Sequence, residues 1–517
     1  MASASTPSVL GVVGAGTMGA GIAQLGCAAG MRTLLYDPVP EALEGGAARV
    51  RDGLRRWTER GRVGPEAERL LETVRALDEL APSELVIEAA PERFELKREL
   101  FERLSEACGA ETVLASNTSS IPVTSLAGAS RCPENVVGMH FFNPPPLMRL
   151  VEVIAADQSG ERALEVANAT GEAMGKRVIR AADGPGFLVN RCGRPFAAEA
   201  LRLLQERVAD HEQIDRICRL EGGFRMGPFE LMDLVGIDVG LEVAKSFAEL
   251  SFGEPRWQPS MLAARMVAAG RHGRKTGRGW YDYGADPYRP DDPEPLQPGG
   301  GDGRVVVIDG HGRLARELRE RALAAGFDAR GPGTLQRADP ELLVDASVPA
   351  DSGGAASGGL PVLVACADRS LAARGAPDAV GFHLLPPLSD VRLVELTRLP
   401  TTPERSAAAA ERFFAALGLH REWVADAPGL VLGRIVCQLV NEVAFALGEG
   451  VGSAEDVDAG LELGLNHPRG AVAWAEAIGL DHVLAVIDGL YAERREERYR
   501  AAPLLRRATS LGRSLSG

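Results

Sequence analysis

The first half of the chain alternates short apolar runs with longer amphipathic segments. Five apolar runs occur before residue 142, and helix-like segments separate the first four: VLGVVG, RTLLYD, ELVIEA, TVLASN and VVGMHF. This alternation is typical of a mostly parallel sheet with helices on its faces. From Pro185 onward the pattern becomes helical, and the longest run, FLVNRCGRPFAAEALRLLQERV, contains Pro195. We expect that proline to kink the helix or to break it.

A segment rich in Pro, Gly and Asp, from Pro287 to Gly303, interrupts the helical pattern. Such a composition favours an exposed linker, so the chain is predicted to fall into two halves. Beyond the linker the same succession begins again, with an α/β unit followed by a helical unit. The predicted fold class is therefore α/β plus all-α, with each half built on the same plan.

The two halves also share sequence. GMHFFNPPPLMRLVEV (138–153) recurs as GFHLLPPLSDVRLVEL (381–396), at an offset of 243 residues. The offset holds without a gap over nearly 100 residues, which predicts an internal duplication. It relates these pairs: His140 and His383, Glu152 and Glu395, Glu199 and Glu442, Asp215 and Asp458, Gly227 and Gly470.

Nearer the start of each half the offset is larger. Gly14-Ala15-Gly16 matches Gly310-His311-Gly312 at an offset of 296, so the second half is 53 residues shorter there (296 − 243). We therefore expect the second α/β unit to lack part of the structure that follows its glycine-rich turn.

The first glycine-rich turn carries a dinucleotide-binding fingerprint. Gly14, Gly16 and Gly19 stand between an apolar run and a helix-like segment, where they allow a tight turn, close approach of a pyrophosphate, and close packing of helix on strand. The next run ends in Asp37, about 20 residues on, where a carboxylate accepts ribose hydroxyls and repels a 2′-phosphate. The pattern predicts NAD rather than NADP.

The second turn is weaker as a cofactor site. Ala315 stands in place of the third glycine, and the segment after Gly326 has no strand that ends in an acid. The second half is predicted to keep the turn of the fold without a cofactor.

Composition excludes several classes of protein. A length of 517 residues predicts several domains, and a net charge of −14 gives no basic surface for nucleic acid. No apolar run reaches the roughly 18 residues that span a bilayer. The seven cysteines form no Cys-x-x-Cys pair, so we expect no structural metal and a cytoplasmic protein.

His140 and Glu152 are candidates for acid–base chemistry. Oxidation of a secondary alcohol with NAD needs a base for the hydroxyl proton while a hydride leaves carbon. Histidine suits this role near neutral pH, and a carboxylate next to it fixes the tautomer and stabilises the imidazolium. The two residues flank a Pro-rich turn, so we expect them to face each other.

Five motifs make the first half resemble a known family. In order and spacing, residues 8–284 are similar to the L-3-hydroxyacyl-CoA dehydrogenase family through these segments: SNTSSIPVTSL (116–126), GMHFFNPPPLMRLVEV (138–153), DGPGFLVNR (183–191), MGPFELMDLVGID (226–238) and KTGRGWYDY (275–283). The resemblance implies NAD-dependent oxidation of an L-3-hydroxyacyl-CoA to the 3-ketoacyl-CoA, or the reverse.

The resemblance also implies roles for individual residues. His140 is expected to be the general base and Glu152 its partner. Ser119 is expected to bind the 3-oxygen of the substrate, and Asn190 to hold the thioester region of the acyl-CoA. It implies that these further residues contact the cofactor: Glu92, Lys97, Asn117, Ser119, Asn143 and Lys275.

The second half has lost parts of this set. His383 and Glu395 persist, but Asn190 maps onto Gly433 and Ser119 onto Arg369. We therefore expect one working site, in the first half.

The whole chain resembles the long bacterial members of the family, the 3-hydroxybutyryl-CoA and 3-hydroxyadipyl-CoA dehydrogenases. Their plan leaves open a homodimer, or a monomer in which the second helical domain acts as an internal partner. The resemblance predicts these segments: residues 1–183 as an NAD-binding Rossmann domain, 184–284 as a helical domain, 285–302 as a linker, 303–425 as a degenerate Rossmann-like domain and 426–517 as a second helical domain.

Three alternatives remain open from the sequence. The first is a dehydrogenase of a free hydroxy acid or sugar acid such as L-gulonate, although the HFFNPPPLMRLVEV run favours a CoA thioester. The second is a multifunctional fatty-oxidation subunit, which needs a long segment before the first strand. The third is a non-catalytic binding protein, which suits the second half better than the first. Acyl length stays undetermined, because no motif encodes the shape of the pocket.

Overall fold

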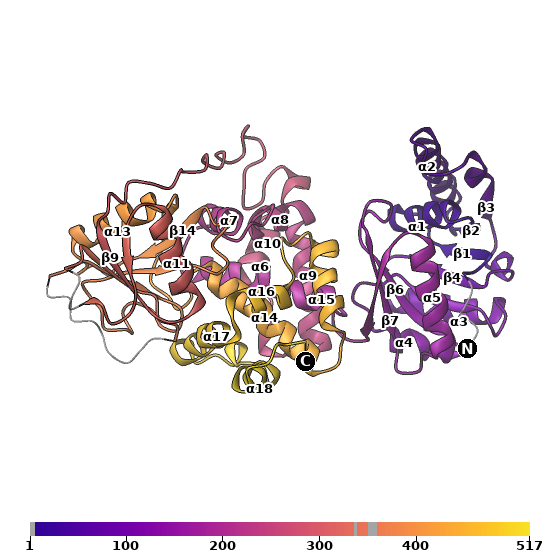
Figure 1. Cartoon of the computed structure of the whole chain (residues 1–517). Helices are drawn as coiled ribbons and strands as arrows, with labels where there is room; N and C mark the ends of the chain where they lie inside the picture. Colours follow the sequence, from indigo (N-terminus) through magenta and orange to yellow (C-terminus); the bar gives the residue numbers. More distant parts are fainter. Residues whose placement is uncertain (1–5, 336–338, 350–358, 517) are drawn as a thin grey trace. The chain divides into compact units, whose positions relative to one another are not determined.

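The computed structural model describes residues 6–335, 339–349 and 359–516. The chain divides into unit 1 (Met1–Arg191 and Gly450–Leu465) and unit 2 (Cys192–Glu449 and Asn466–Gly517) (Figure 1). Unit 1 holds one sheet with its helices, and unit 2 holds a second sheet together with most of the helical segments.

The first sheet has eight strands: β1 (Val9–Val13), β2 (Arg32–Tyr36), β3 (Leu71–Val74), β4 (Leu85–Glu88), β5 (Val113–Ser116), β6 (Val136–Phe141), β7 (Leu150–Ala155) and β8 (Arg177–Ala182). Their order is β3-β2-β1-β4-β5-β6-β7-β8, and all neighbours are parallel except the antiparallel pair β6 and β7. The five apolar runs predicted as strands are β1, β2, β4, β5 and β6. Buried on both sides, they show the continuous apolar pattern of central parallel strands.

Unit 1 contains these helices: α1 (Thr17–Ala28), α2 (Pro40–Glu59), α3 (Phe94–Ala107), α4 (Val123–Ala127), α5 (Glu161–Ala173) and α15 (Ala454–Leu465). The apolar sides of α1, α2 and α5 share one core cluster with the strands. Helix α15 comes from the second half of the chain and packs against β7 and β8. Arg177 on β8 pairs with Glu455 on α15 at 2.7 Å.

The second sheet has seven strands: β9 (Val305–Asp309), β10 (Asp328–Arg330), β11 (Leu342–Asp345), β12 (Val362–Ala365), β13 (Val380–His383), β14 (Leu393–Thr397) and β15 (His420–Trp423). Their order is β10-β9-β11-β12-β13-β14-β15, with β13 and β14 as the one antiparallel pair. This is the order of the first sheet without β3. The described part of the second half has no counterpart of that strand, in agreement with the predicted shortening.

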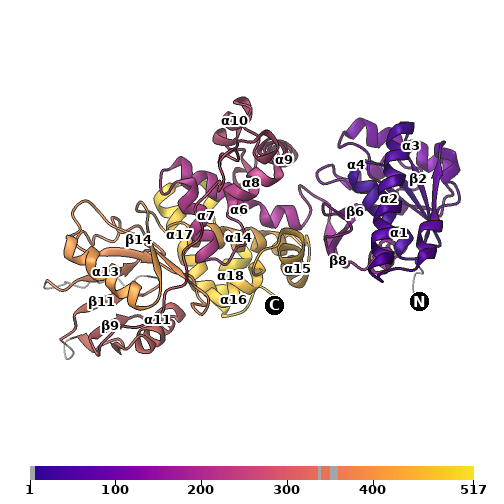
Figure 2. The same cartoon turned by 90° about the horizontal axis from the view of Figure 1, so that it is seen from above.

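The other helices are α6 (Val189–Gln205), α7 (His211–Leu220), α8 (Pro228–Val235), α9 (Ile237–Leu250), α10 (Met261–Ala268), α11 (Arg313–Ala324), α13 (Glu404–Ala416), α14 (Leu432–Gly448), α16 (Ala471–Ile478), α17 (Leu480–Arg494) and α18 (Pro503–Leu511). Helix α6 continues through Pro195, so the proline does not break it. Helix α14 is buried along nearly all its length, with α16, α17 and α18 packed around it (Figure 2). Such an all-buried helix forms the centre of a helical core.

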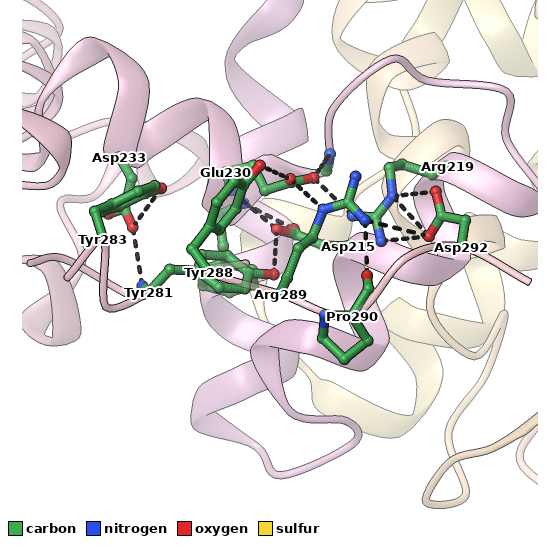
Figure 3. A network of polar contacts seen from close by, with 12 residues as sticks. Asp215, Arg219, Glu230, Asp233, Tyr281, Tyr283, Tyr288, Arg289, Pro290 and Asp292 are labelled. Carbon is green, nitrogen blue, oxygen red and sulfur yellow. Dashed lines mark hydrogen bonds and ion pairs between the residues drawn. The ribbon is translucent and has the colours of Figure 1, made fainter. Parts of the chain in front are cut away.

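The start of the predicted linker is anchored rather than fully exposed (Figure 3). The Tyr288 hydroxyl donates to Glu230 at 2.8 Å, and Arg289 pairs with the same carboxylate at 2.7 Å. Asp292 pairs with Arg219 at 2.8 Å. These half-buried contacts fasten the segment to α7 and α8, so the expectation of an exposed connector is wrong for its first residues.

Candidate active site

The glycine-rich turn between β1 and α1 has the geometry that the fingerprint predicts. Gly14 has a φ of +99°, and a Cβ on it would lie 2.6 Å from the carbonyl oxygen of Ala89. A Cβ on Gly19 would lie 1.8 Å from the carbonyl oxygen of Gly14. At Gly16 a Cβ would meet no atom within 4 Å, which leaves room for a pyrophosphate at the positive end of α1. The turn therefore fits a dinucleotide.

Asp37 follows β2 directly and lies beside this turn. Its carboxylate accepts the backbone N–H of Ala15 at 2.8 Å and that of Val39 at 2.9 Å. A carboxylate fixed here can accept ribose hydroxyls, whereas a 2′-phosphate would meet its negative charge. These residues fit NAD.

His140 and Glu152 face each other as expected. They are cross-strand partners on the antiparallel strands β6 and β7, and His140 Nδ1 lies 2.6 Å from Glu152 Oε2. Because a carboxylate only accepts, Nδ1 carries a proton, and in the neutral form of the ring Nε2 has the lone pair. The Phe142 ring lies 4.7 Å from the imidazole, which is 6 % exposed. The pair is therefore a buried, oriented base.

Glu152 is held by backbone amides on its other side. Its Oε1 accepts the N–H of Leu188 at 3.2 Å and of Val189 at 2.9 Å, where α6 begins. Donors of this kind stabilise a carboxylate in its charged form. The start of α6 thus fixes the group that orients His140.

Ser119 and Asn117 lie in the loop that follows β5, and Glu92 organises this loop. One oxygen of Glu92 accepts the Ser119 N–H at 2.9 Å and the Thr118 hydroxyl at 2.6 Å. Burial alone would raise the pKa of Glu92, but Lys97 and these donors hold it below its ordinary value. Asn117 accepts the N–H of Phe141 at 2.8 Å, which ties the loop to the strand of His140.

Lys97 is a buried lysine with two carboxylate partners. It is 1 % exposed, pairs with Glu88 at 2.7 Å, and lies 3.4 Å from Glu92. Glu88 also accepts the hydroxyl of Ser116 at 2.6 Å. Sequence reasoning missed Glu88, although a carboxylate inside the apolar run ELVIEA signals a buried cation. This network supports the loop that carries Ser119.

For three predicted residues the structure gives a position but does not test the expected role. Asn190 is half-buried on α6, directly after the amides that hold Glu152. Asn143 is exposed beyond β6. Lys275 belongs to unit 2, where it pairs with Asp238 at 2.6 Å. Their expected roles stay predictions.

The second His–Glu pair has the same strand register but different contacts. His383 and Glu395 are cross-strand partners on β13 and β14. Glu395 accepts the N–H of Val431 at 2.7 Å and of Leu432 at 2.8 Å, so it keeps the two amides that the first pair also has. It makes no hydrogen bond to His383 in the described part of the chain.

His383 instead contacts another histidine and a glycine. Its Nε2 lies 3.2 Å from Nε2 of His482, while Nδ1 has no partner among the described residues. A Cβ on Gly433 would lie 2.1 Å from the imidazole, so the ring rests against α14. Burial lowers the pKa of His383 well below its ordinary range. The imidazole of His383 is therefore uncharged and shielded from solvent.

Glu395 has an acidic neighbour where Glu152 has a histidine. Burial raises the pKa of Glu395 to about 8, and the adjacent carboxyl group is that of Glu221. Burial and Glu395 raise the pKa of Glu221 well above its ordinary range. Two such carboxyl groups favour a protonated, uncharged state.

Two further features bear on function. Among the described residues no group of His, Cys, Asp and Glu could hold a metal ion. Within the same residues, no helix is both long enough and apolar enough to cross a membrane.

Comparisons with known proteins agree with these features. The family model "3-hydroxyacyl-CoA dehydrogenase, NAD binding domain" matches residues 9–184. The model "3-hydroxyacyl-CoA dehydrogenase, C-terminal domain" matches twice, at residues 186–283 and 429–515. The second match begins at the segment that carries the amides bonded to Glu395.

Individual relatives are similar over the whole chain or over its first half. The 3-hydroxyadipyl-CoA dehydrogenase of Escherichia coli is 34% identical over 505 residues, 97% of each chain. A probable 3-hydroxybutyryl-CoA dehydrogenase of Bacillus subtilis is 40% identical over 53% of this chain and 96% of its own. The crystal structure of 3-hydroxybutyryl-CoA dehydrogenase from Escherichia coli K12 matches with a TM-score of 0.81 at 32% identity, covering 98% of this chain and 99% of that one.

Proposed function

The chain belongs to the 3-hydroxyacyl-CoA dehydrogenase family of NAD-dependent enzymes, and on that premise we propose that its one working site lies in unit 1. The 2.6 Å contact between His140 and Glu152 is the observation that carries this proposal. Only this pair, among the described residues, joins an oriented imidazole to a carboxylate held by two backbone amides.

In the oxidative direction, His140 accepts the substrate's hydroxyl proton at Nε2, because Nδ1 is committed to Glu152. Glu152 stabilises the imidazolium that forms, while the amides of Leu188 and Val189 keep its charge in place. Bound NAD supplies the acceptor for the hydride. In the reverse direction the imidazolium returns the proton to the 3-oxygen of the ketone.

We assign the remaining residues by their surroundings. The Ser119 hydroxyl, on the loop tied to β6, binds the 3-oxygen, and the Asn190 amide binds near the thioester carbonyl. Gly16 and Asp37 hold the pyrophosphate and the adenosine ribose. The expected cofactor contacts of the other residues rest on the family pattern: Glu92, Lys97, Asn117, Asn143 and Lys275.

The substrate class that we propose is a short 3-hydroxyacyl-CoA, like those named for the similar dehydrogenases. The test is oxidation of NADH with acetoacetyl-CoA, longer 3-ketoacyl-CoAs and 3-ketoadipyl-CoA, set against the free acids. We expect turnover with the thioesters. Turnover with a free keto acid or a sugar acid, and none with a thioester, would contradict the proposal.

We also propose that the second half arose by duplication and serves as an internal partner. Two glutamates related by the 243-residue offset support this: Glu199 pairs with Arg434 of the second half at 2.9 Å, and Glu442 pairs with Arg256 of the first half at 2.8 Å. Both ion pairs join the first half of the chain to the second within one molecule. Light scattering should give the mass of a single chain, and a dimer would contradict the proposal.

The location that we propose is the cytoplasm. The seven cysteines form no disulfide bond among the described residues and six of them are buried, which suits a reducing compartment. Secretion of the protein with paired cysteines would contradict it.

A further inference from the structure

Helix α15 belongs to the second half of the sequence but packs inside unit 1, against β7 and β8. Its buried face consists of Val457, Gly460, Leu461 and Gly464, at the spacing of one side of a helix. Two of these four residues are glycines, which lower helix propensity by up to about 1 kcal/mol each. Glycines in such positions indicate that other groups approach the helix backbone closely.

The close approach is made by residues of the first half. A Cβ on Gly464 would lie 2.9 Å from the side chain of Leu150 and 3.3 Å from that of Phe142. A Cβ on Gly460 would lie 2.6 Å from the side chain of Val189. An added methyl group would therefore force the helix or its neighbours to move. With glycine at both positions, α15 can lie directly on β7 and on the start of α6.

Two of the contacted residues adjoin the His–Glu pair of unit 1. The ring centroid of Phe142 lies 4.7 Å from that of His140. The backbone N–H of Val189 donates to the Glu152 carboxylate at 2.9 Å. Both Phe142 and Val189 are buried, and close-packed interiors transmit small displacements. The position of α15 therefore affects a neighbour of the imidazole and a donor to the carboxylate at the same time.

Unit 2 has a different residue at the matching place. There α7 packs against β14, and Glu221, directly after α7, corresponds to Gly464 (221 + 243). In the same way Leu385 corresponds to Phe142 (142 + 243). The carboxyl group of Glu221 lies beside that of Glu395 and beside the backbone of Leu385. At this place unit 2 has a carboxyl group next to its glutamate, and unit 1 has a glycine.

We propose that α15 positions the His140–Glu152 pair through the close contacts that Gly460 and Gly464 allow. The second half of the chain thereby supplies part of the packing that orients the base in unit 1. This inference rests on the proposed function. Gly460 and Gly464 are positioning residues, because they act through Phe142 and Val189 and carry no reactive group.

The first test is Gly464→Ala in the full-length enzyme. We expect kcat with acetoacetyl-CoA and NADH to fall about 10-fold and KM to change less than about twofold, because the substitution disturbs the orientation of the base and leaves substrate binding intact. Gly448→Ala, near the exposed end of α14, is the matched control, since the nearest atom to its Cβ would be Leu504 Cβ at an ordinary 3.5 Å. It should leave kcat unchanged. An unchanged kcat in Gly464→Ala, or a loss confined to KM, would overturn the inference.

A double-mutant cycle distinguishes positioning from a general loss of structure. If α15 acts through Glu152, then Gly464→Ala should lower kcat less than about twofold in an enzyme that already carries Glu152→Gln. The same 10-fold loss in both backgrounds would overturn the inference.

A compensating substitution gives a second test of the same contacts. Gly460→Ala should lower kcat to a similar degree as Gly464→Ala. Adding Val189→Ala removes the methyl groups that the new Cβ meets, so the double variant should recover part of the lost kcat. Recovery of none of it would overturn the role of the Gly460 contact.

A measurement that needs no turnover separates failure of this inference from failure of the proposed function. The Nδ1 proton of His140, in a short hydrogen bond to Glu152, should give a low-field proton NMR resonance that is absent in His140→Ala. We expect this resonance to shift or broaden in Gly464→Ala and to stay unchanged in Gly448→Ala. An unchanged resonance in Gly464→Ala would overturn the inference. A resonance that responds to Gly464→Ala in a protein that turns over no thioester would support the role of α15 and overturn the dehydrogenase assignment.

Discussion

The two His–Glu pairs share the same strand register but differ in the contacts of their side chains. In both sheets the histidine and glutamate are cross-strand partners, and the glutamate accepts two amides from the start of the next helix. In unit 1 the imidazole also bonds the carboxylate, at 2.6 Å. In unit 2 the imidazole of His383 contacts His482 instead, and the carboxyl group of Glu395 lies beside that of Glu221.

The difference follows from one position on the helix. Asn190 of the first half corresponds to Gly433 of the second (190 + 243), and the ring of His383 fills the space that a side chain on Gly433 would need. In unit 2 the histidine is therefore enclosed by closure of α14 on its ring. A His and a Glu at these two strand positions are therefore not sufficient for an oriented base, because the two side chains must also contact each other.

Replacing each histidine is the strongest test of this comparison. His140→Ala should lower kcat by about 10²- to 10⁴-fold, because the general base and its orientation disappear together. His383→Ala should leave most of the activity, because that ring faces protein on all sides. Steady-state rates with acetoacetyl-CoA measure both, and equal losses would contradict the one-site interpretation.

Replacing each glutamate should give a smaller contrast. Glu152→Gln keeps the shape but removes the charge that orients Nδ1 and stabilises the imidazolium, so kcat should fall about 100-fold or more. Glu395→Gln replaces a carboxyl that is already largely uncharged and should change kcat little. The readout is kcat at saturating substrate and NADH, with NADH binding as the control for folding. A large loss from Glu395→Gln would indicate that the second pair takes part in turnover.

Much of the fold could be predicted from the sequence, because periodicity is local. The five apolar runs are strands, and the sheet that lacks β3 agrees with a shortening inferred from two offsets. The His140–Glu152 contact could also be predicted, because residues that flank a turn between antiparallel strands face each other.

The contacts that the sequence could not give are long-range pairings of buried polar groups. Nothing near Glu221 in the sequence indicates that it lies beside Glu395, and nothing near Arg434 indicates Glu199. Such pairs depend on how helices of one half pack against strands or helices of the other.

A side chain introduced at position 433 should lower the free energy of unfolding and leave the rate of turnover unchanged. Gly433→Asn places atoms where the His383 ring lies, so we expect a loss of about 1–3 kcal/mol in the free energy of unfolding, typical of an overpacked core. Asn190→Gly at the matching position should affect kcat/KM instead. Calorimetric unfolding and steady-state kinetics on both variants measure the contrast, and a stable Gly433→Asn variant would contradict the closure of α14.

The smallest effect that we expect is a dependence of stability on pH that belongs to unit 2. Glu395 has a folded pKa of about 8, above its ordinary 4.5, so the folded state retains a proton that the unfolded chain releases. Its contribution is complete below about pH 4.5 and declines as pH rises through 8. His482, with a pKa lowered to about 4 by burial, contributes fully above its ordinary 6.5 and loses that contribution as pH falls.

Glu221→Gln should reduce the fall of the free energy of unfolding at alkaline pH by up to ~1 kcal/mol per pH unit, since an amide next to Glu395 carries no competing charge. Thermal unfolding at pH 6, 7, 8 and 9 tests this, with Glu404→Gln as the control at an exposed glutamate of unit 2. Parallel curves for wild type and Glu221→Gln would show that the two buried carboxyl groups do not titrate together.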